Sequence, residues 1–248
     1  GIESILRIKI AEGYRFIRTS DEELAVSEMF KSHQGEGPTA GYPAIFLRLQ
    51  GCNLLCSWCD TIDIWVRGEI YRVDDLLDIW ESKGWVKDLS SGYMLVITGG
   101  EPLMRQNSIV TLLKAFIKRY SFKPRVEVET NGTIEPQKEL IELTDQFNVS
   151  PKLSNSGMPL NIRYRIAPLR ILAGSGKAIF KFVVVDERDV KEILWYIESV
   201  PLPRDKVYLM PESKSREEYL SRVGIVEKIC REHGFKLSPR LHLVHGWK

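Results

Sequence analysis

Six short apolar runs, rich in β-branched and aromatic residues, recur along the chain, and helix-like stretches separate most of them. Runs of this length and composition are typical of buried strands. A strand, a helix and a second strand in succession pair in parallel with the helix outside. The pattern predicts an α/β fold, a barrel or a partial (open) TIM-type β/α barrel of about six parallel strands with outer helices. The runs are 44–49, 93–98, 125–129, 147–150, 179–185 and 206–210.

Apolar residues at helical spacing mark four of the intervening stretches. In the first, Leu76, Leu77 and Trp80 share one face and Gly84 follows as a stop. We therefore expect helices over 73–84, 108–120, 189–200 and 216–234.

Composition limits the class of protein. With 44% hydrophobic residues in 248, the chain can bury a core, and its longest apolar runs fall well short of the roughly 18 residues that a membrane span needs. The first residues lack the continuous apolar region of a signal peptide, so we expect a cytoplasmic protein with no membrane partner. Thirty-five basic and 33 acidic side chains nearly cancel, which gives no sign of a nucleic-acid partner. No linker divides the chain, so we expect one domain over 1–248, with an N-terminal extension, 1–25, of unknown role.

Three of the four cysteines lie within eight positions, directly after the first strand run, as Cys52, Cys56 and Cys59 in the spacing CxxxCxxC. Ligands bind at the carboxyl ends of parallel strands in such folds, so a site is expected here. Structural zinc needs a fourth ligand, for which only Cys230 or His33 is at hand. A disulfide leaves one thiol unpaired and suits a reducing compartment badly. An iron–sulfur cluster held by three thiolates leaves one iron open to a small molecule.

Polar groups follow the next strand runs in the same way. Gly99 and Gly100 come after the run at 93–98 and let a ligand approach the backbone, and Glu101 adds a carboxylate suited to an ammonium group. Each group alone is also typical of an ordinary turn or cap. Because the strand ends share one edge of the sheet, together they predict one cavity. The later strand ends add Glu129, Thr130, Asn131, Ser150 and Lys152.

The CxxxCxxC loop followed by Gly-Gly-Glu-Pro at 99–102 resembles the radical S-adenosylmethionine superfamily. The resemblance implies that Cys52, Cys56 and Cys59 hold one [4Fe-4S] cluster whose open iron binds the methionyl amine and carboxylate, and that reduction yields a 5′-deoxyadenosyl radical. The S-adenosylmethionine contacts that it implies are Trp58, Cys59, Asp60, Gly99, Gly100, Glu101, Glu129, Asn131, Ser150, Pro151, Lys152, Met210, Pro211, Glu212 and Ser213.

The residues before and after the cysteine loop resemble one family within this superfamily. Gln34, Gly35, Glu36 and Gly37 form a QGEG element, Arg48 lies four residues before Cys52, and an Asp-Thr pair follows Cys59. From about residue 26 to the end, the chain resembles the 7-carboxy-7-deazaguanine synthases. These enzymes contract 6-carboxy-5,6,7,8-tetrahydropterin to 7-carboxy-7-deazaguanine with loss of ammonia, on the path to queuosine and archaeosine.

The resemblance also implies Mg²⁺ on Thr61, an electron donor such as flavodoxin or ferredoxin, and a homodimer. His242 is expected in an alternating strand, where it is as well suited to a structural role. Two alternatives remain open, a different radical enzyme such as a glycyl-radical activase, and a zinc-stabilised binding module. The implied substrate contacts are His33, Gln34, Gly35, Glu36, Arg48, Thr98, His242 and the terminal Lys248.

Overall fold

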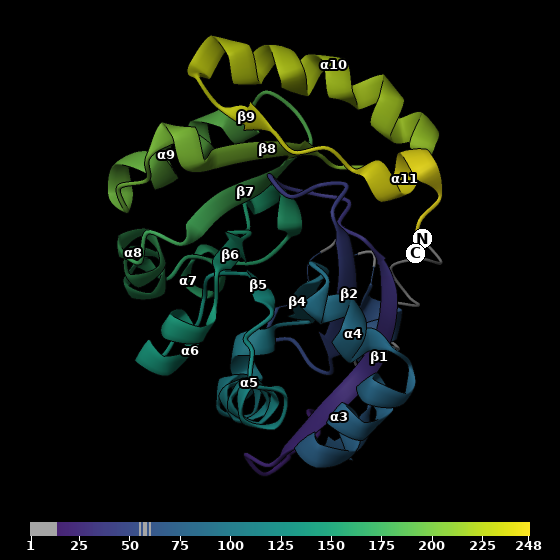
Figure 1. Cartoon of the computed structure of the whole chain (residues 1–248). Coiled ribbons are helices and arrows are strands. Elements are labelled where there is room, and N and C mark those ends of the chain that lie inside the picture. The colour runs from purple at the N-terminus through teal and green to yellow at the C-terminus, as the bar shows by residue number, and fades with distance from the viewer. Residues whose placement is uncertain (1–13, 55, 57–58, 60) are drawn as a thin grey trace.

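The computed structural model describes residues 14–54, 56, 59 and 61–248. Within them, nine strands form one sheet in the order β3-β1-β2-β4-β5-β6-β7-β8-β9. From β2 to β9 the neighbours in the sheet are parallel, whereas β1 is antiparallel to both β2 and β3. The sheet curves with helices on its outside, and β3 and β9 form its open edges (Figure 1). The predicted open barrel with a largely parallel sheet is confirmed.

All six predicted strand runs are strands, and each end differs from its prediction by at most one residue. All four predicted helices are present with ends that agree within two residues. The strands are β1 Glu23–His33, β2 Pro43–Leu49, β3 Glu69–Arg72, β4 Met94–Gly99, β5 Arg125–Thr130, β6 Gln146–Val149, β7 Ala178–Val184, β8 Val207–Pro211 and β9 Lys236–Leu237. The α-helices are α2 Ile62–Trp65, α3 Val73–Ser82, α4 Trp85–Ser90, α5 Gln106–Tyr120, α6 Lys138–Leu143, α7 Leu160–Arg163, α8 Ile166–Gly174, α9 Asp189–Ser199, α10 Arg216–His233 and α11 Leu241–His245.

The alternation of side chains along each strand separates the core from the cavity, because successive side chains point to opposite faces. On β7, Phe180 and Phe182 are buried in the apolar core, while Lys181 between them lines the cavity inside the curve. The same holds on β2, where Leu47 belongs to the core and Arg48 to the cavity. Helices cover the core face with their own apolar stripes, which on α5 comprise Ile109, Leu112, Leu113 and Phe116.

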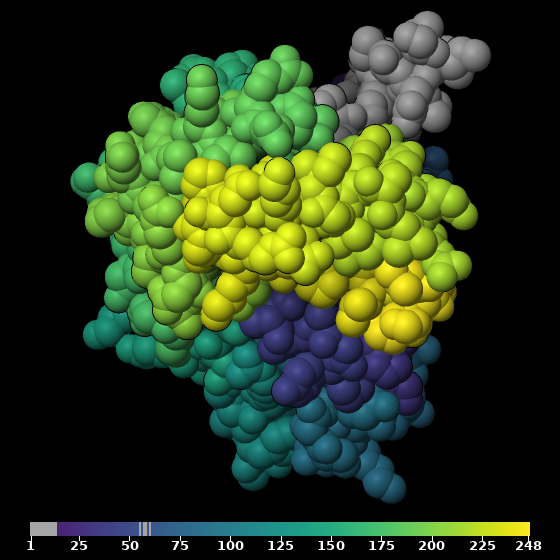
Figure 2. Space-filling model, turned by 90° about the horizontal axis from the view of Figure 1, so that it is seen from above, coloured from purple at the N-terminus to yellow at the C-terminus, as the bar shows by residue number. Residues whose placement is uncertain are grey.

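The C-terminal part of the chain returns to the N-terminal part. Helix α10 packs on β8 and β9, and α11 follows beside the segment that joins β1 to β2 (Figure 1). Leu241 N donates to Gly35 O at 2.8 Å, and Gly37 N donates to Ser238 Oγ at 2.9 Å. Figure 2 shows the yellow C-terminal residues packed over the purple N-terminal ones. Two segments about 200 positions apart in the sequence, one after β1 and one after β9, are therefore hydrogen-bonded to each other.

The strand predicted around His242 is wrong, since the structure has the short helix α11 there. The residues after β9 do not extend the sheet but turn toward the segment between β1 and β2, where Leu241 N donates to Gly35 O. Among the described residues, no helix combines the length and apolar character needed to cross a membrane.

Candidate active site at the strand ends

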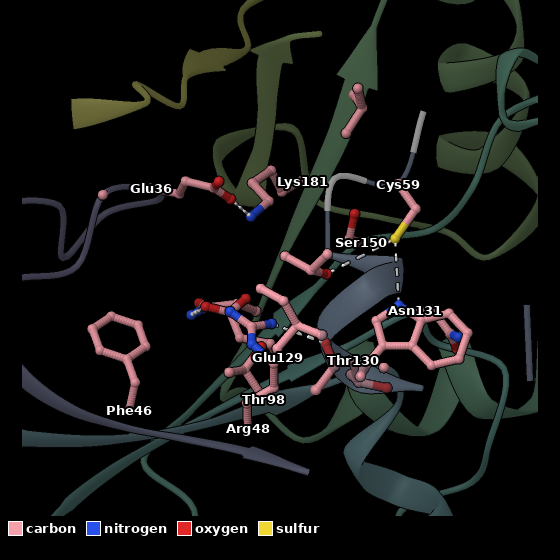
Figure 3. A pocket seen from close by; sticks show the side chains of 18 of the residues that line it. Glu36, Phe46, Arg48, Cys59, Thr98, Glu129, Thr130, Asn131, Ser150 and Lys181 are labelled. Atoms are coloured by element: carbon pink, nitrogen blue, oxygen red, sulfur yellow. Dashed lines mark hydrogen bonds and ion pairs between the residues drawn. The ribbon is translucent and has the colours of Figure 1, made fainter. Parts of the chain in front are cut away.

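A cavity of about 410 Å³ opens inside the curve of the sheet, at the carboxyl ends of the parallel strands. This volume is in the range of small-molecule sites. Figure 3 shows Glu36 and Lys181 together, Cys59 to their right, and Arg48, Thr98 and Glu129 below the pair. We call the part formed by Cys52, Cys56 and Cys59 the cysteine end, and the part formed by Glu36, Lys181, Arg240 and His242 the ionic end.

At the cysteine end, three thiols that form no disulfide line the cavity wall. Burial raises the pKa of the Cys52 thiol to about 12, so this group holds its proton at neutral pH unless a cation binds it, and a coordinating thiol is deprotonated by its metal. No three His, Cys, Asp or Glu side chains in the described part of the chain converge on a single-ion site. A cubane cluster takes one thiolate for each iron, so separated thiols on one wall suit it. The donor set therefore fits an iron–sulfur cluster with one open iron.

The cysteine end is packed directly against the end of β4. A Cβ atom on Gly100 would lie 2.0 Å from Gly51 O and 2.8 Å from Cys52 Cβ, so only glycine fits here. Glu101 N also donates to Gly51 O at 2.8 Å. Gly100 and Glu101, directly after β4, thus hold the start of the cysteine loop against the sheet.

Glu101 does not line the cavity and is only 1% exposed. Its carboxylate accepts hydrogen bonds from Thr130 Oγ1 at 2.8 Å and Asn131 N at 2.7 Å, and also from Leu103 N at 3.1 Å. Burial raises its pKa. The expected contact with a bound ammonium group stays a prediction, while the geometry shows Glu101 fixing Thr130 and Asn131 in the cavity wall.

The middle of the cavity carries an ion pair between neighbouring strands. Arg48 Nε on β2 lies 3.0 Å from Glu28 Oε1 on β1, and Arg48 Nη1 donates to Gly99 O at 3.2 Å. Thr98 is opposite Arg48 in the register of β2 with β4. The guanidinium is thereby held beside the turn that packs on the cysteine loop.

At the ionic end, Glu36 and Lys181 form an ion pair, and Arg240 Nε lies 3.5 Å from the second carboxylate oxygen of Glu36. Burial by itself raises the pKa of Glu36, but the charges of Lys181, Arg240 and His242 outweigh it and lower the pKa well below its ordinary range. Burial likewise opposes the charge on Lys181, yet Glu36 and Glu129 raise its pKa. Both partners are therefore charged at neutral pH.

Glu129 is the second carboxyl group near the ionic end. Burial raises its pKa, and neighbouring Glu36 and Glu127 add to this while Lys181 opposes it. Gln34 Nε2 donates to its Oε1 at 3.1 Å and Asn148 Nδ2 does so at 3.3 Å. Of the two, Glu129 holds a proton more readily than Glu36.

Most of the predicted site residues meet in this one cavity. Trp58 and Asp60 lie outside the described residues, and four predicted residues do not line the cavity: Glu101, Pro151, Pro211 and Ser213. Those that do are His33, Gln34, Gly35, Glu36, Arg48, Cys52, Cys56, Cys59, Thr61, Thr98, Gly99, Gly100, Glu129, Asn131, Ser150, Lys152, Met210, Glu212, His242 and Lys248.

Sequence reasoning missed several side chains of the cavity, among them Trp65, Lys181 and Arg240. For Lys181 a signal existed, because a lysine between two phenylalanines in a buried strand must face away from the core that they enter. For Trp65 and Arg240, no periodic pattern in the sequence indicates that the side chain faces the cavity.

Comparison with known proteins agrees with this geometry. The chain matches a family model described as "4Fe-4S single cluster domain" over residues 33–167. It is 36% identical over 219 residues to the 7-carboxy-7-deazaguanine synthase of Pyrobaculum aerophilum, covering 88% of this chain and 93% of that one. It is 33% identical over 227 residues to the same enzyme of Hyperthermus butylicus, covering 89% and 92%.

Among solved structures, QueE from Escherichia coli is similar with a TM-score of 0.66 and 24% identity, over 87% of this chain and 93% of that one. At 24% identity this structural similarity supports the fold alone, and the family is identified by the curated relatives. The chain belongs to the 7-carboxy-7-deazaguanine synthase family of radical S-adenosylmethionine enzymes, which carry a [4Fe-4S] cluster.

Proposed function

We propose that this chain is a 7-carboxy-7-deazaguanine synthase, which contracts the ring of 6-carboxy-5,6,7,8-tetrahydropterin with loss of ammonia. The observation that carries the proposal is that three cysteine thiols and the ion-paired QGEG carboxylate, Glu36, line the same cavity. Membership of the family supports the same conclusion.

Cys52, Cys56 and Cys59 would hold the cluster. When bound, the cluster and S-adenosylmethionine supply the radical that takes a hydrogen atom from the substrate. The protein's part is to orient the substrate and exclude water. Ser150 and Lys152 suit the methionyl carboxylate, since Lys152 Nζ lies 3.2 Å from Ser150 Oγ and both side chains line the cavity.

The ionic end would bind the pterin. An ionised carboxylate accepts two parallel hydrogen bonds from a guanidine-like edge, and Lys181 and Arg240 keep Glu36 in that state. Arg48 and Thr98, in the middle of the cavity, would donate hydrogen bonds to the substrate's carbonyl or carboxylate oxygens. His33, His242 and Lys248 would close the same end.

Mg²⁺ is proposed at Thr61, whose side chain lines the cavity beside Cys59. A hard cation prefers oxygen ligands and keeps several waters, so one hydroxyl together with substrate oxygens is a suitable set. We further propose a single domain, a flavodoxin or ferredoxin as electron donor, a homodimer, and action in the cytoplasm.

The test is turnover by anaerobically reconstituted protein supplied with the carboxytetrahydropterin, S-adenosylmethionine, Mg²⁺ and a reductant. We expect 7-carboxy-7-deazaguanine and ammonia in equal amounts, and less product when Mg²⁺ is removed by a chelator. Cluster-loaded protein that forms no deazapurine would defeat the proposal and leave another radical enzyme, such as an activase, as the alternative. Protein that binds one zinc and no iron would instead favour the binding module.

A further inference from the structure

The indole of Trp65 lies against one of the three thiols. Trp65 ends α2, is 1% exposed and lines the cavity, and its Nε1 donates to Cys59 Sγ at 3.5 Å. Sulfur acceptors allow longer hydrogen bonds than oxygen, and an indole N–H is a donor only. Trp65 can therefore give a hydrogen bond to this sulfur but cannot ligate a metal or take up a proton.

The indole is fixed from several sides. Gly51 N donates to Trp65 O at 2.9 Å and Trp65 N donates to Thr61 O at 3.0 Å, which ties α2 to both ends of the cysteine loop. The Tyr14 ring meets the Trp65 ring edge to face, with centroids 5.4 Å apart and an interplanar angle of 88°. Tyr14 in turn bonds through its hydroxyl to the backbone of Cys52. The direction of the N–H toward Cys59 is thus set by packing.

We propose that the Trp65 N–H tunes the reduction potential of the cluster, and the inference rests on the proposed ligation of iron by Cys59. One-electron reduction by a low-potential donor makes the cluster and its sulfurs more negative. A hydrogen bond to a ligating sulfur stabilises that reduced state more than the oxidised one and so raises the potential. Trp65 itself gains and loses neither electron nor proton, which makes it a positioning and tuning residue.

Other donors near these sulfurs are less suited to this role. Leu54 N donates to Cys52 Sγ at 3.4 Å, but it is a backbone group. Thr61 Oγ1 is 3.9 Å from Cys59 Sγ, at the limit for a hydrogen bond to sulfur, and it is the proposed Mg²⁺ ligand. Among the side chains that the structure describes around these sulfurs, Trp65 is therefore the one whose hydrogen bond can be removed without touching a proposed ligand.

The test is a potentiometric titration, followed by electron paramagnetic resonance, of reconstituted wild type, Trp65→Phe and Trp80→Phe. Trp80 is the matched control, because it is fully buried in α3 and its Nε1 has no hydrogen-bond partner among the described residues. We expect Trp65→Phe to keep its iron and sulfide, and the reduction potential of its cluster to be more negative than in wild type. A tenfold smaller equilibrium constant for one-electron reduction, the largest effect expected, corresponds to about 59 mV. Trp80→Phe should titrate as wild type.

An unchanged potential in cluster-loaded Trp65→Phe would overturn the inference, and so would an equal shift in Trp80→Phe. If Trp65→Phe binds no cluster, pulsed magnetic resonance of the reduced wild type decides, with tryptophan labelled by ¹⁵N at the indole. A coupling between the cluster and an indole nitrogen that persists in Trp58→Phe supports the inference, and its absence defeats it. Wild type without any cluster would refute the proposed function itself, whereas a loaded cluster of unchanged potential refutes only the role of Trp65.

Discussion

At one end of the cavity, Cys52, Cys56 and Cys59 come from eight consecutive positions of a single loop. At the other end, the ion pair joins Glu36 to Lys181, which are 145 positions apart, and Arg240 approaches from the C-terminal part of the chain. The cysteine end thus depends on residue type and local spacing, whereas the ionic end exists only once the whole sheet has formed. Changes at the first should remove the cofactor, and changes at the second should alter stability and substrate affinity.

The largest expected effect is the loss of the cluster in Cys56→Ala. Two remaining thiolates do not hold a cubane that already has one open iron, so we expect colourless protein, no bound iron or sulfide, and no turnover. Circular dichroism of the apo-protein should stay that of wild type. Cys230→Ala is the control, because Cys230 is buried in α10 and does not line the cavity. A cluster retained by Cys56→Ala would show that the cysteine end is misassigned.

The next effect is expected for Gly100→Ala, which keeps every thiol. The added methyl group meets backbone, Gly51 O at 2.0 Å, and backbone cannot yield as a side chain can. We expect most of the bound iron to be lost and the free energy of unfolding to fall by ~1–3 kcal/mol, the usual cost of overpacking. Gly174→Ala, where nothing lies within 4 Å of the new methyl group, should leave both unchanged. Iron analysis and denaturant unfolding measure the two effects, and a full cluster in Gly100→Ala would contradict the proposed packing role.

The same contrast explains what could be predicted from the sequence. Strand runs and the residues that follow them are local signals, so the sequence predicts the open barrel and places the thiols and Gly100 at strand ends, but it gives no sign that Gly100 packs on Gly51. The 11-residue β1 was missed because charged residues interrupt its apolar pattern. The ion pair of Lys181 with Glu36 was not predicted. A local sequence pattern cannot show that two residues 145 positions apart will meet. The strand expected at His242 is wrong for a related reason, because the backbone there bonds to Gly35, about 200 positions earlier in the sequence.

Lys181→Met should have an intermediate effect, on stability and on its pH dependence. It leaves Glu36 buried without its main partner, which costs roughly 3 kcal/mol, toward the lower end for a broken buried ion pair because Arg240 remains. In wild type the lowered pKa of Glu36 gives stability that is fully present above its ordinary value of 4.5 and is lost only as the pH falls toward the lowered value. Without Lys181, burial raises that pKa, so this contribution should disappear at higher pH than in wild type.

Denaturant unfolding at neutral and at mildly acidic pH measures both effects. Lys114→Met is the control, because the Lys114–Glu139 pair is about half exposed on the surface and should be worth less than ~1 kcal/mol. The double variant Lys181→Met with Glu36→Gln should recover part of the loss, since the carboxylate that Lys181 neutralised is then no longer charged. If Lys181→Met unfolds like Lys114→Met at both pH values, the ionic end does not depend on this pair.

The smallest effect is expected for Gly35→Ala, the counterpart of Gly100→Ala at the ionic end. Its methyl group would lie 2.2 Å from His242 Nδ1 and 3.1 Å from His242 N, but both atoms belong to the five-residue α11, which can shift. We expect a loss of about 1 kcal/mol in stability, a several-fold rise in the KM for the pterin, and an unchanged iron content. Gly224→Ala, in an open position of α10, should be neutral or stabilising by ~0.5–1 kcal/mol. If Gly35→Ala lost its iron as Gly100→Ala is expected to do, the two ends of the cavity would not be independent, and the displacement of α11 would have to reach the cysteine loop.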